Sequence, residues 1–185
     1  MLPLSLDIRS VRIVLVGGGP QALGRLRLLD AAGAGMLKVF AEAPSDELAA
    51  AAGDRLVRRM AAASDLAGAR LVFLADLGTE AEELAAAARG QGALVNREDV
   101  PHLCDFHMPA IVRRGDLLIA ISTGGKAPGL ARRLRERLEA LFPEAWGPRL
   151  QRLAAERLAW KEAGASTAEL SQRTKALIDR EGWLP

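Results

Sequence analysis

The sequence has a single cysteine, contains no long apolar run, and its charges nearly cancel. One thiol, Cys104, cannot close an internal disulfide, so we expect a reducing compartment, the cytoplasm. No stretch approaches the roughly 18 uninterrupted apolar residues that a membrane span requires. The apolar run at 11–16 follows no basic leader and ends in glycines instead of a cleavage site. It is therefore expected to be a strand, not part of a signal peptide.

Internal repeats, low-complexity linkers and an excess of one charge are also missing. The 185 residues include 25 basic and 23 acidic side chains, and half of all residues are apolar. This apolar fraction, with a net charge of only +2, excludes a chain that is disordered throughout. The balance of charge gives little reason to expect a nucleic-acid or membrane partner, and we predict neither. The length suits one domain, or one domain with a small appendage.

Up to about residue 108, short β-branched runs alternate with Ala/Leu-rich stretches of helical periodicity. Strands separated by helices imply crossover connections, which predict an α/β fold with a doubly wound, mostly parallel, Rossmann-like sheet. The runs are apolar without alternation, as expected for strands that are covered on both faces. The expected strands are 11–16, 37–40, 56–60, 71–75 and 93–96.

The pattern changes after residue 108. Runs at 110–113 and 117–122 are separated by Arg114-Gly115-Asp116, which predicts a β-hairpin. A long helix is then expected from Pro128, a residue suited to the first helical turn, to about Leu141. From residue 144 the pattern is helical again, with a break at 164–166.

A glycine-rich turn joins the first expected strand to the first expected helix. Gly17 permits a tight turn, Gly19 lets the backbone approach a pyrophosphate, and Ala22 is small enough for close packing of helix on sheet. The N–H groups and the dipole of the helix start favour phosphates. The cofactor-binding residues predicted from this turn are Gly17, Gly18, Gly19, Pro20, Gln21 and Ala22.

Glu42 follows Ala22 by about 20 residues, at the end of the second expected strand. A carboxylate at this place accepts hydrogen bonds from both ribose hydroxyls and repels a 2′-phosphate, so it favours NAD over NADP. The alternative interpretation is a tight strand–helix turn without a ligand, with Glu42 as a solvated loop acid. The residues by themselves leave both interpretations open.

A long and uncommon motif occupies residues 95–135. It begins Val-Asn96-Arg-Glu-Asp99, passes through Phe106 and Pro109 into Ala-Ile-Val-Arg-Arg, and ends Ile-Ser-Thr-Gly-Gly-Lys-Ala-Pro-Gly-Leu-Ala-Arg-Arg-Leu-Arg135. Together with the glycine turn, this motif resembles the precorrin-2 dehydrogenase / sirohydrochlorin ferrochelatase family, which is also the N-terminal part of siroheme synthase. The resemblance covers about residues 8–145.

The resemblance implies NAD-dependent oxidation of precorrin-2 to sirohydrochlorin in siroheme or cobalamin-type tetrapyrrole synthesis, with insertion of Fe²⁺ or Co²⁺ as a further activity. It also implies three parts: an NAD-binding Rossmann domain at 1–108, a dimerisation segment at 109–142, and a small helical domain at 143–185. A homodimer is expected on this ground alone. Asp99 matches the aspartate to which the family assigns the roles of general base and proton acceptor during metallation.

Chemistry agrees with this role for Asp99. The residue follows the fifth expected strand, at the carboxyl edge of the sheet, where open α/β folds bind their ligands. Removing a hydride from a reduced tetrapyrrole leaves a cation that must lose a proton, so a nearby carboxylate is useful. The alternative is that Asp99, which precedes Val-Pro, only shapes a turn.

The tetrapyrrole substrate is a polycarboxylate, so its site needs cations and amide donors. Arginine forks suit carboxylates, and the Gly-Gly turn before the helix at Pro128 offers backbone N–H groups. The alternative is a solvated basic helix face, which is the expectation for Arg135 and Arg137. The predicted substrate-binding residues are Arg113, Arg114, Ser122, Thr123, Gly124, Gly125, Lys126 and Arg132.

His102, Cys104 and His107 share one short segment. Their spacing matches no closed zinc pattern, and three such ligands in one loop make a poor structural site. No metal ligand is therefore predicted with certainty. His107, beside the Phe-x-x-Pro element, is retained as a weak candidate for transient metal or substrate contact.

Two departures from the family pattern concern the cofactor. Gly24 stands where a basic residue is usual, and the segment after the fourth expected strand has lost its first hydroxyl. Asp76 and Thr79 are expected to replace some polar contacts to the nicotinamide ribose, and Asn96 is included among the cofactor-binding residues. Because of these departures, a non-catalytic module that senses NAD or binds a tetrapyrrole remains an alternative function. A chelatase without dehydrogenase activity is the other alternative. The chain length predicts a stand-alone enzyme without a fused methyltransferase domain.

Overall fold

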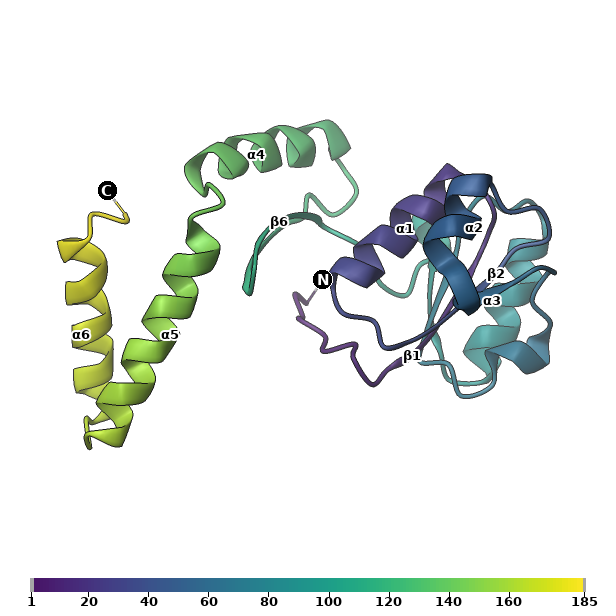
Figure 1. Ribbon diagram of the computed structural model, residues 1–185. Helices are drawn as coiled ribbons and strands as arrows, with labels where there is room; N and C mark the ends of the chain where they lie inside the picture. The colour runs from purple at the N-terminus through teal and green to yellow at the C-terminus, as the bar shows by residue number, and fades with distance from the viewer. Residues whose placement is uncertain (1, 185) are drawn as a thin grey trace. The chain divides into compact units, whose positions relative to one another are not determined.

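The computed structural model describes residues 2–184 and divides after Met108 into two compact units. The first unit holds a five-stranded, fully parallel sheet in the order β3-β2-β1-β4-β5, which confirms the expected Rossmann-like α/β fold (Figure 1). Its strands are β1 (Arg12–Val16), β2 (Met36–Phe40), β3 (Leu56–Val57), β4 (Leu71–Leu74) and β5 (Leu94–Arg97). Its helices are α1 (Pro20–Ala31), α2 (Asp46–Ala52) and α3 (Glu80–Gly90), with short 3₁₀ turns η1 (Gly53–Arg55), η2 (Ala63–Leu66) and η3 (Pro101–Leu103).

The central strand β1 is buried on both sides because helices cover both faces of the sheet. Ile13 and Leu15 pack with α1 and α2 in one apolar cluster. Val14 and Val16 pack with α3 and η2 in the other. Alternate residues of one strand thus enter two different cores, which explains why the sequence of β1 is apolar without alternation.

The edge strand β3 is shorter than the expected run at 56–60. Only Leu56 and Val57 pair with β2. The chain then turns, because the Arg59 N–H donates a hydrogen bond to the Val57 carbonyl at 2.9 Å. The Arg59 guanidinium also pairs with Asp65. The β-branched run alone does not predict this ion pair, which directs the chain away from the sheet.

The second unit contains the expected hairpin and three helices. β6 (Ala110–Arg114) pairs with β7 (Leu117–Ile121) in antiparallel register. The helix α4 (Pro128–Leu141) begins with Pro128 in its first turn, as the sequence predicts. Two further helices follow, α5 (Trp146–Glu162) and α6 (Thr167–Arg180).

The helices α5 and α6 form an antiparallel pair across the break at 164–166 (Figure 1). Ser166 caps α6: its Oγ accepts from the Glu169 N–H, and the Glu169 carboxylate accepts from the Ser166 N–H. Arg152 of α5 forms an ion pair with Glu181 at 3.0 Å. Within residues 2–184, no helix has the length and apolar character needed to cross a membrane.

Candidate functional site

A cavity of about 480 Å³ opens at the carboxyl edge of the parallel sheet. β1, β2 and β4 end beside it. From β1 the chain continues to β2 and β3 on one side of the sheet, and then crosses to β4 and β5 on the other side of β1. This is the place where open α/β sheets bind their ligands. The cavity is lined by Gly17, Gly18, Gly19, Phe40, Ala41, Glu42, Ala43, Pro44, Ser45, Met60, Asp76, Leu77, Gly78 and Glu80.

The glycine turn is enclosed by the ends of its neighbouring strands. Gly17 has a φ of +144°, and a Cβ there would lie 2.0 Å from the Ala75 carbonyl oxygen. The Gly17 N–H donates to the Phe40 carbonyl at 2.9 Å, and the Ser45 N–H donates to the Gly18 carbonyl at 2.8 Å. No other residue type fits at Gly17, because both the space and the backbone conformation exclude a side chain.

The first amides of α1 converge on one carboxylate, that of Asp76. Its Oδ2 accepts hydrogen bonds from the N–H groups of Gly19 at 3.0 Å and Ala22 at 2.8 Å. Its Oδ1 accepts from the Gln21 N–H at 3.3 Å. Pro20, which has no N–H, occupies the first helical position. The turn therefore binds an anionic group through backbone donors, as a phosphate-binding turn does.

The residues of this edge fit a dinucleotide. The absence of side chains at Gly17 and Gly19 lets a diphosphate approach the backbone of the turn. The amides of Gly19, Gln21 and Ala22 are the donors for it once the Asp76 carboxylate releases them. Glu42, two residues beyond β2, is exposed and lines the same cavity, where a ribose would present its hydroxyls. The expected grouping of the glycine turn with Glu42 and Asp76 is therefore present in the first unit. Ala22 is fully buried against the sheet, in agreement with its predicted packing role.

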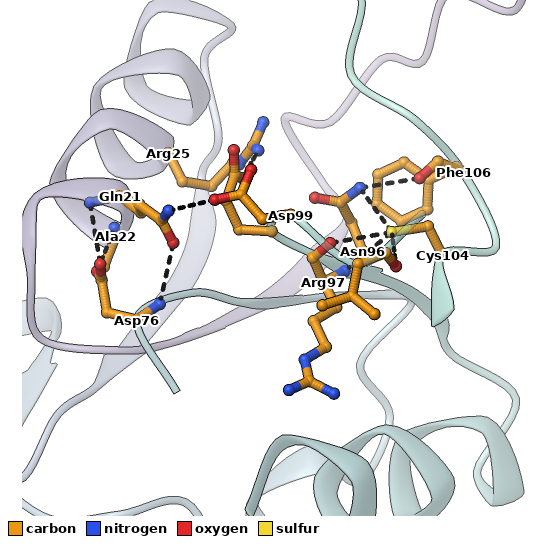
Figure 2. Close-up of polar contacts among 11 residues, drawn as sticks. Gln21, Ala22, Arg25, Asp76, Asn96, Arg97, Asp99, Cys104 and Phe106 are labelled. Atoms are coloured by element: carbon orange, nitrogen blue, oxygen red, sulfur yellow. Dashed lines mark hydrogen bonds and ion pairs between the residues drawn. The ribbon is translucent and has the colours of Figure 1, made fainter. Parts of the chain in front are cut away.

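Asp99 lies just beyond β5 and is hydrogen-bonded to the glycine turn. The Gln21 Nε2 donates to Asp99 Oδ2 at 2.7 Å, while Gln21 Oε1 accepts from the Asp76 N–H at 3.4 Å (Figure 2). Gln21 thus connects the ends of β4 and β5. Asp99 has a φ of +59°, a left-handed conformation that non-glycine residues rarely adopt.

The neighbouring Glu98 forms an ion pair with Arg25 of α1. Arg25 is only 8% exposed, and its guanidinium lies over the Phe73 ring, 5.5 Å from the ring centroid. This pair holds the start of the Asp99 loop against α1. Arg25 and Glu98 were not among the residues predicted to form the site. The signal was the position of Arg25 on the same helix face as Ala22, Leu26 and Leu29.

Cys104 and Asn96 fix the far end of the same loop. The Cys104 thiol donates to the Arg97 carbonyl at 3.0 Å, and its sulfur accepts from the Arg97 N–H at 3.3 Å (Figure 2). Asn96 is 6% exposed and its Nδ2 donates to the Phe106 carbonyl at 2.9 Å. In this structure both side chains hold the loop that carries Asp99. Neither lines the cavity.

The predicted substrate residues all belong to the second unit. Arg114 is engaged inside that unit: it donates to the carbonyls of Phe142 at 2.7 Å and Arg113 at 2.9 Å, and pairs with Glu144. Among the described residues, the buried Arg113 Nε has no hydrogen-bond partner. Arg132 forms an exposed pair with Glu136 on α4.

In the turn before α4, two glycines have a left-handed backbone conformation, and side-chain hydroxyls accept hydrogen bonds from backbone amides. Gly124 and Gly125 have φ values of +63° and +77°. The Ser122 Oγ accepts from the Gly124 N–H, and the Thr123 Oγ1 accepts from the Ala127 N–H. Lys126 is exposed beside them.

No set of three His, Cys, Asp or Glu side chains that could hold a metal ion occurs within residues 2–184. His102 and His107 are exposed, and Cys104 is directed into its own loop. The residues described here therefore contain no preformed metal centre around His107.

Sequence relatives agree with the motif resemblance. The chain is 43% identical over 159 residues to siroheme synthase of Methylococcus capsulatus, across 84% of this chain and 33% of that protein. It is 46% identical over 152 residues to siroheme synthase of Pseudomonas putida, across 79% of this chain and 32% of that protein. The chain thus spans about a third of the length of these relatives.

A solved structure named "SirC, precorrin-2 dehydrogenase" shares the fold. It matches with a TM-score of 0.80 over 100% of this chain and 92% of its own, at 24% identity. At this identity the likeness establishes the fold alone.

Two family models cover the chain in succession. One described as "Sirohaem biosynthesis protein central" matches residues 114–141, which include β7 and α4. One described as "Putative NAD(P)-binding" matches residues 4–110, which include the whole parallel sheet. These matches and the siroheme synthase relatives confirm the resemblance found in the motifs and the expected dinucleotide cofactor. Because the match over 4–110 spans more than half of the sequence, the chain belongs to this NAD(P)-binding family.

Proposed function

We propose that the chain oxidises precorrin-2 to sirohydrochlorin with NAD⁺ as the oxidant. The observation that carries the proposal is the hydrogen bond between Gln21 of the cofactor turn and Asp99, the carboxylate at the end of β5. It brings a proton acceptor to the turn where a dinucleotide fits. The siroheme synthase relatives and the fold shared with SirC support the same reaction.

The proposed cofactor residues bind different parts of the dinucleotide. The amides of the turn at Gly17–Gly19 and of the α1 start hold the pyrophosphate. Glu42 accepts hydrogen bonds from the hydroxyls of one ribose and disfavours a 2′-phosphate, which selects NAD over NADP. Pro20, Gln21, Ala22, Asp76 and Asn96 complete the proposed set. Asn96 acts through the loop that it holds, and Asp76 acts on the cofactor site through its hydrogen bonds to the amides of α1.

Asp99 supplies the base. When bound, NAD⁺ accepts the hydride that leaves the reduced macrocycle. The macrocycle then carries a positive charge and loses a proton, which the Asp99 carboxylate accepts. Gln21 engages Oδ2 of Asp99, while within residues 2–184 no hydrogen bond to its Oδ1 is found. Oδ1 is the oxygen that takes the proton.

The remaining parts of the proposal concern the substrate and the assembly. Arg113, Lys126 and Arg132, with the amides of residues 122–125, bind the carboxylates of the tetrapyrrole. Arg114 contributes by holding β6 against the end of α4. The three-part division at 108 and 142, the homodimer and the cytoplasmic location remain predictions. Insertion of Fe²⁺ or Co²⁺ into the product is a second activity to be tested in the same assay.

The proposal is tested by mixing the protein anaerobically with precorrin-2 and NAD⁺ and following NADH and the sirohydrochlorin spectrum. The native protein is expected to form both products. The variant Asp99→Asn is expected to lose about 10²-fold or more of the turnover rate, the usual contribution of a general base, while it still binds NAD⁺. Asparagine suits the left-handed backbone at this position, so the fold is retained.

The matched control is Asp54→Asn, an exposed carboxylate at the first turn of η1. It is expected to leave turnover unchanged. If the native protein binds NAD⁺ but forms no sirohydrochlorin, the dehydrogenase proposal is wrong and a binding module is favoured. Addition of Fe²⁺ or Co²⁺ to sirohydrochlorin then tests for a chelatase without dehydrogenase activity.

A further inference from the structure

The amides that open α1 already hold an anion that belongs to the protein. The Asp76 carboxylate accepts from three of them, the N–H groups of Gly19, Gln21 and Ala22, at 3.0, 3.3 and 2.8 Å (Figure 2 draws the Gln21 and Ala22 contacts). Three backbone donors at a helix N-terminus are the group of donors that binds a phosphate in this class of fold. In this structure a side chain from the end of β4 takes their hydrogen bonds.

The carboxylate also fills the space that the second glycine of the turn leaves open. A Cβ at Gly19 would lie 2.7 Å from Asp76 Cγ and 2.9 Å from its Oδ1. In dinucleotide-binding turns, the missing side chain at this position admits the pyrophosphate. A carboxylate and a pyrophosphate cannot share this volume, and their negative charges repel each other.

The position of Asp76 depends on an unusual backbone. Its φ of +53° lies in the left-handed region, which only Gly, Asn and Asp adopt readily. Its N–H donates to Gln21 Oε1 at 3.4 Å, so the end of β4 is tied to the helix that it caps. Asp76, Leu77 and Gly78 also line the cavity, which places this segment beside the cofactor.

We propose that Asp76 determines the affinity for the dinucleotide by competing with its pyrophosphate for the amides of α1. The inference rests on the proposed role of the glycine turn in holding NAD. Binding requires the carboxylate to leave the amides, so the apparent dissociation constant equals the intrinsic one divided by the fraction of molecules in which Asp76 has moved away. If that fraction is about one tenth, the cofactor binds about tenfold more weakly than the cavity alone would allow.

The experiment is a calorimetric titration of the native protein and two variants with NAD⁺ and, separately, with ADP-ribose. Asp76→Asn removes the charge, and Asp76→Gly removes the side chain; both residue types suit the left-handed backbone. We expect Asp76→Gly to bind NAD⁺ about tenfold more tightly. Asp76→Asn loses the charge but keeps the volume and one acceptor oxygen, so a smaller gain in affinity is expected for it. ADP-ribose, which keeps the pyrophosphate but lacks nicotinamide, is expected to show the same gain.

A charge-matched control separates competition from general electrostatics. Glu83→Gln, an exposed position on α3, removes the same charge and is expected to leave the affinity for NAD⁺ unchanged. Equal affinities of native protein and Asp76 variants, or weaker binding by the variants, would overturn the proposal. A gain for NAD⁺ without a gain for ADP-ribose would overturn it too, because Asp76 would then act on the nicotinamide end, as expected from the sequence.

Turnover of precorrin-2 distinguishes this inference from the proposed function. If the Asp76 variants bind NAD⁺ more tightly but neither they nor the native protein form sirohydrochlorin, the affinity proposal stands and the dehydrogenase proposal fails. If the native protein forms sirohydrochlorin and the variants show no gain in affinity, the reverse holds. If native protein and variants all fail to bind NAD⁺ and ADP-ribose, both fail.

Discussion

Two aspartates with a left-handed backbone conformation are both hydrogen-bonded to Gln21. Asp76 and Asp99, with φ values of +53° and +59°, are the non-glycine residues with positive φ in the described part of the chain. Such conformations cost on the order of 1–3 kcal/mol and are concentrated at functional sites. Each follows a strand, β4 or β5. The Gln21 side chain accepts from the Asp76 N–H and donates to the Asp99 carboxylate. One side chain of α1 therefore connects the two aspartates of the site, in addition to the amides of α1 that hold the Asp76 carboxylate.

Gln21 is predicted to position Asp99 for proton transfer. Gln21→Met keeps the length of the side chain but removes the hydrogen bond to the carboxylate, and bonds to charged groups contribute about 1.5–3 kcal/mol. We expect kcat to fall by roughly tenfold or more while the melting temperature changes little, because the Gln21 side chain is exposed. Steady-state kinetics at saturating NAD⁺ measures the change.

Gln21→Lys, which retains a donor, is expected to keep more of the turnover than Gln21→Met. A structural role alone would lower the melting temperature of both variants without separating their kcat values. Equal kcat for the native protein and Gln21→Met would contradict the positioning role.

At the scale of elements, short turns decide where the chain leaves the sheet. The 3₁₀ turn η2 is capped by Asp65, whose carboxylate accepts from the Ala62 N–H at 2.7 Å. The same carboxylate pairs with Arg59, two residues beyond the end of β3 at Val57. The Asp65 side chain thus connects the segment that follows β3 to the turn η2, which packs against α3.

This contact predicts a pH dependence of stability. The Arg59 guanidinium, followed by the Ala62 amide, lowers the pKa of Asp65 from 3.8 to about 2. Because the pKa is lowered by folding, the stabilisation is complete above 3.8 and is lost as the pH falls towards 2. Asp65→Asn is expected to lower the free energy of unfolding by about 1 kcal/mol at pH 7 and by much less at pH 2.

Urea unfolding at the two pH values, followed by circular dichroism, measures the difference. A destabilisation of Asp65→Asn that is equally large at both pH values would show that the charge of Asp65 is not involved.

At the scale of the whole molecule, the two units differ in how much apolar surface they cover. The parallel sheet buries its strands on both faces. In the second unit, the helix α4 exposes Leu130, Leu134 and Leu141 at 54%, 41% and 56%. Their spacing places them along one side of the helix. An exposed row of large apolar side chains is a common feature of protein interaction sites.

The homodimer implied by the resemblance is predicted to use this row. Sedimentation equilibrium is expected to give about twice the chain mass of 19.7 kDa. Leu130→Arg combined with Leu134→Arg is expected to give the mass of one chain, because two buried cations cannot be paired in a self-association interface.

The control is Met36→Arg, an equally exposed apolar position at the start of β2. It is expected to leave the mass unchanged. A native protein that sediments as one chain would show that the homodimer prediction is wrong.

The sequence pattern was sufficient to predict most of the helices and strands. Five apolar runs became five parallel strands, and the helix expected from Pro128 to about Leu141 has those bounds. Local chemistry explains this success, because proline at a helix start and glycine at a tight turn act on their own backbone. The run at 56–60 was predicted too long because Arg59, inside that run, pairs with Asp65, which lies outside the strand pattern.

The sequence by itself determined the layered fold, the glycine turn and the family, since each depends on residues near one another in the chain. Only the tertiary structure decided that Asp76 caps the amides of α1 from 54–57 residues away, and that Gln21 reaches Asp99 across 78 residues. Periodicity carries no information on such contacts, because they arise where parallel strands end at a common edge. The same edge therefore brings together the proposed base, the cofactor turn and the carboxylate that competes for it.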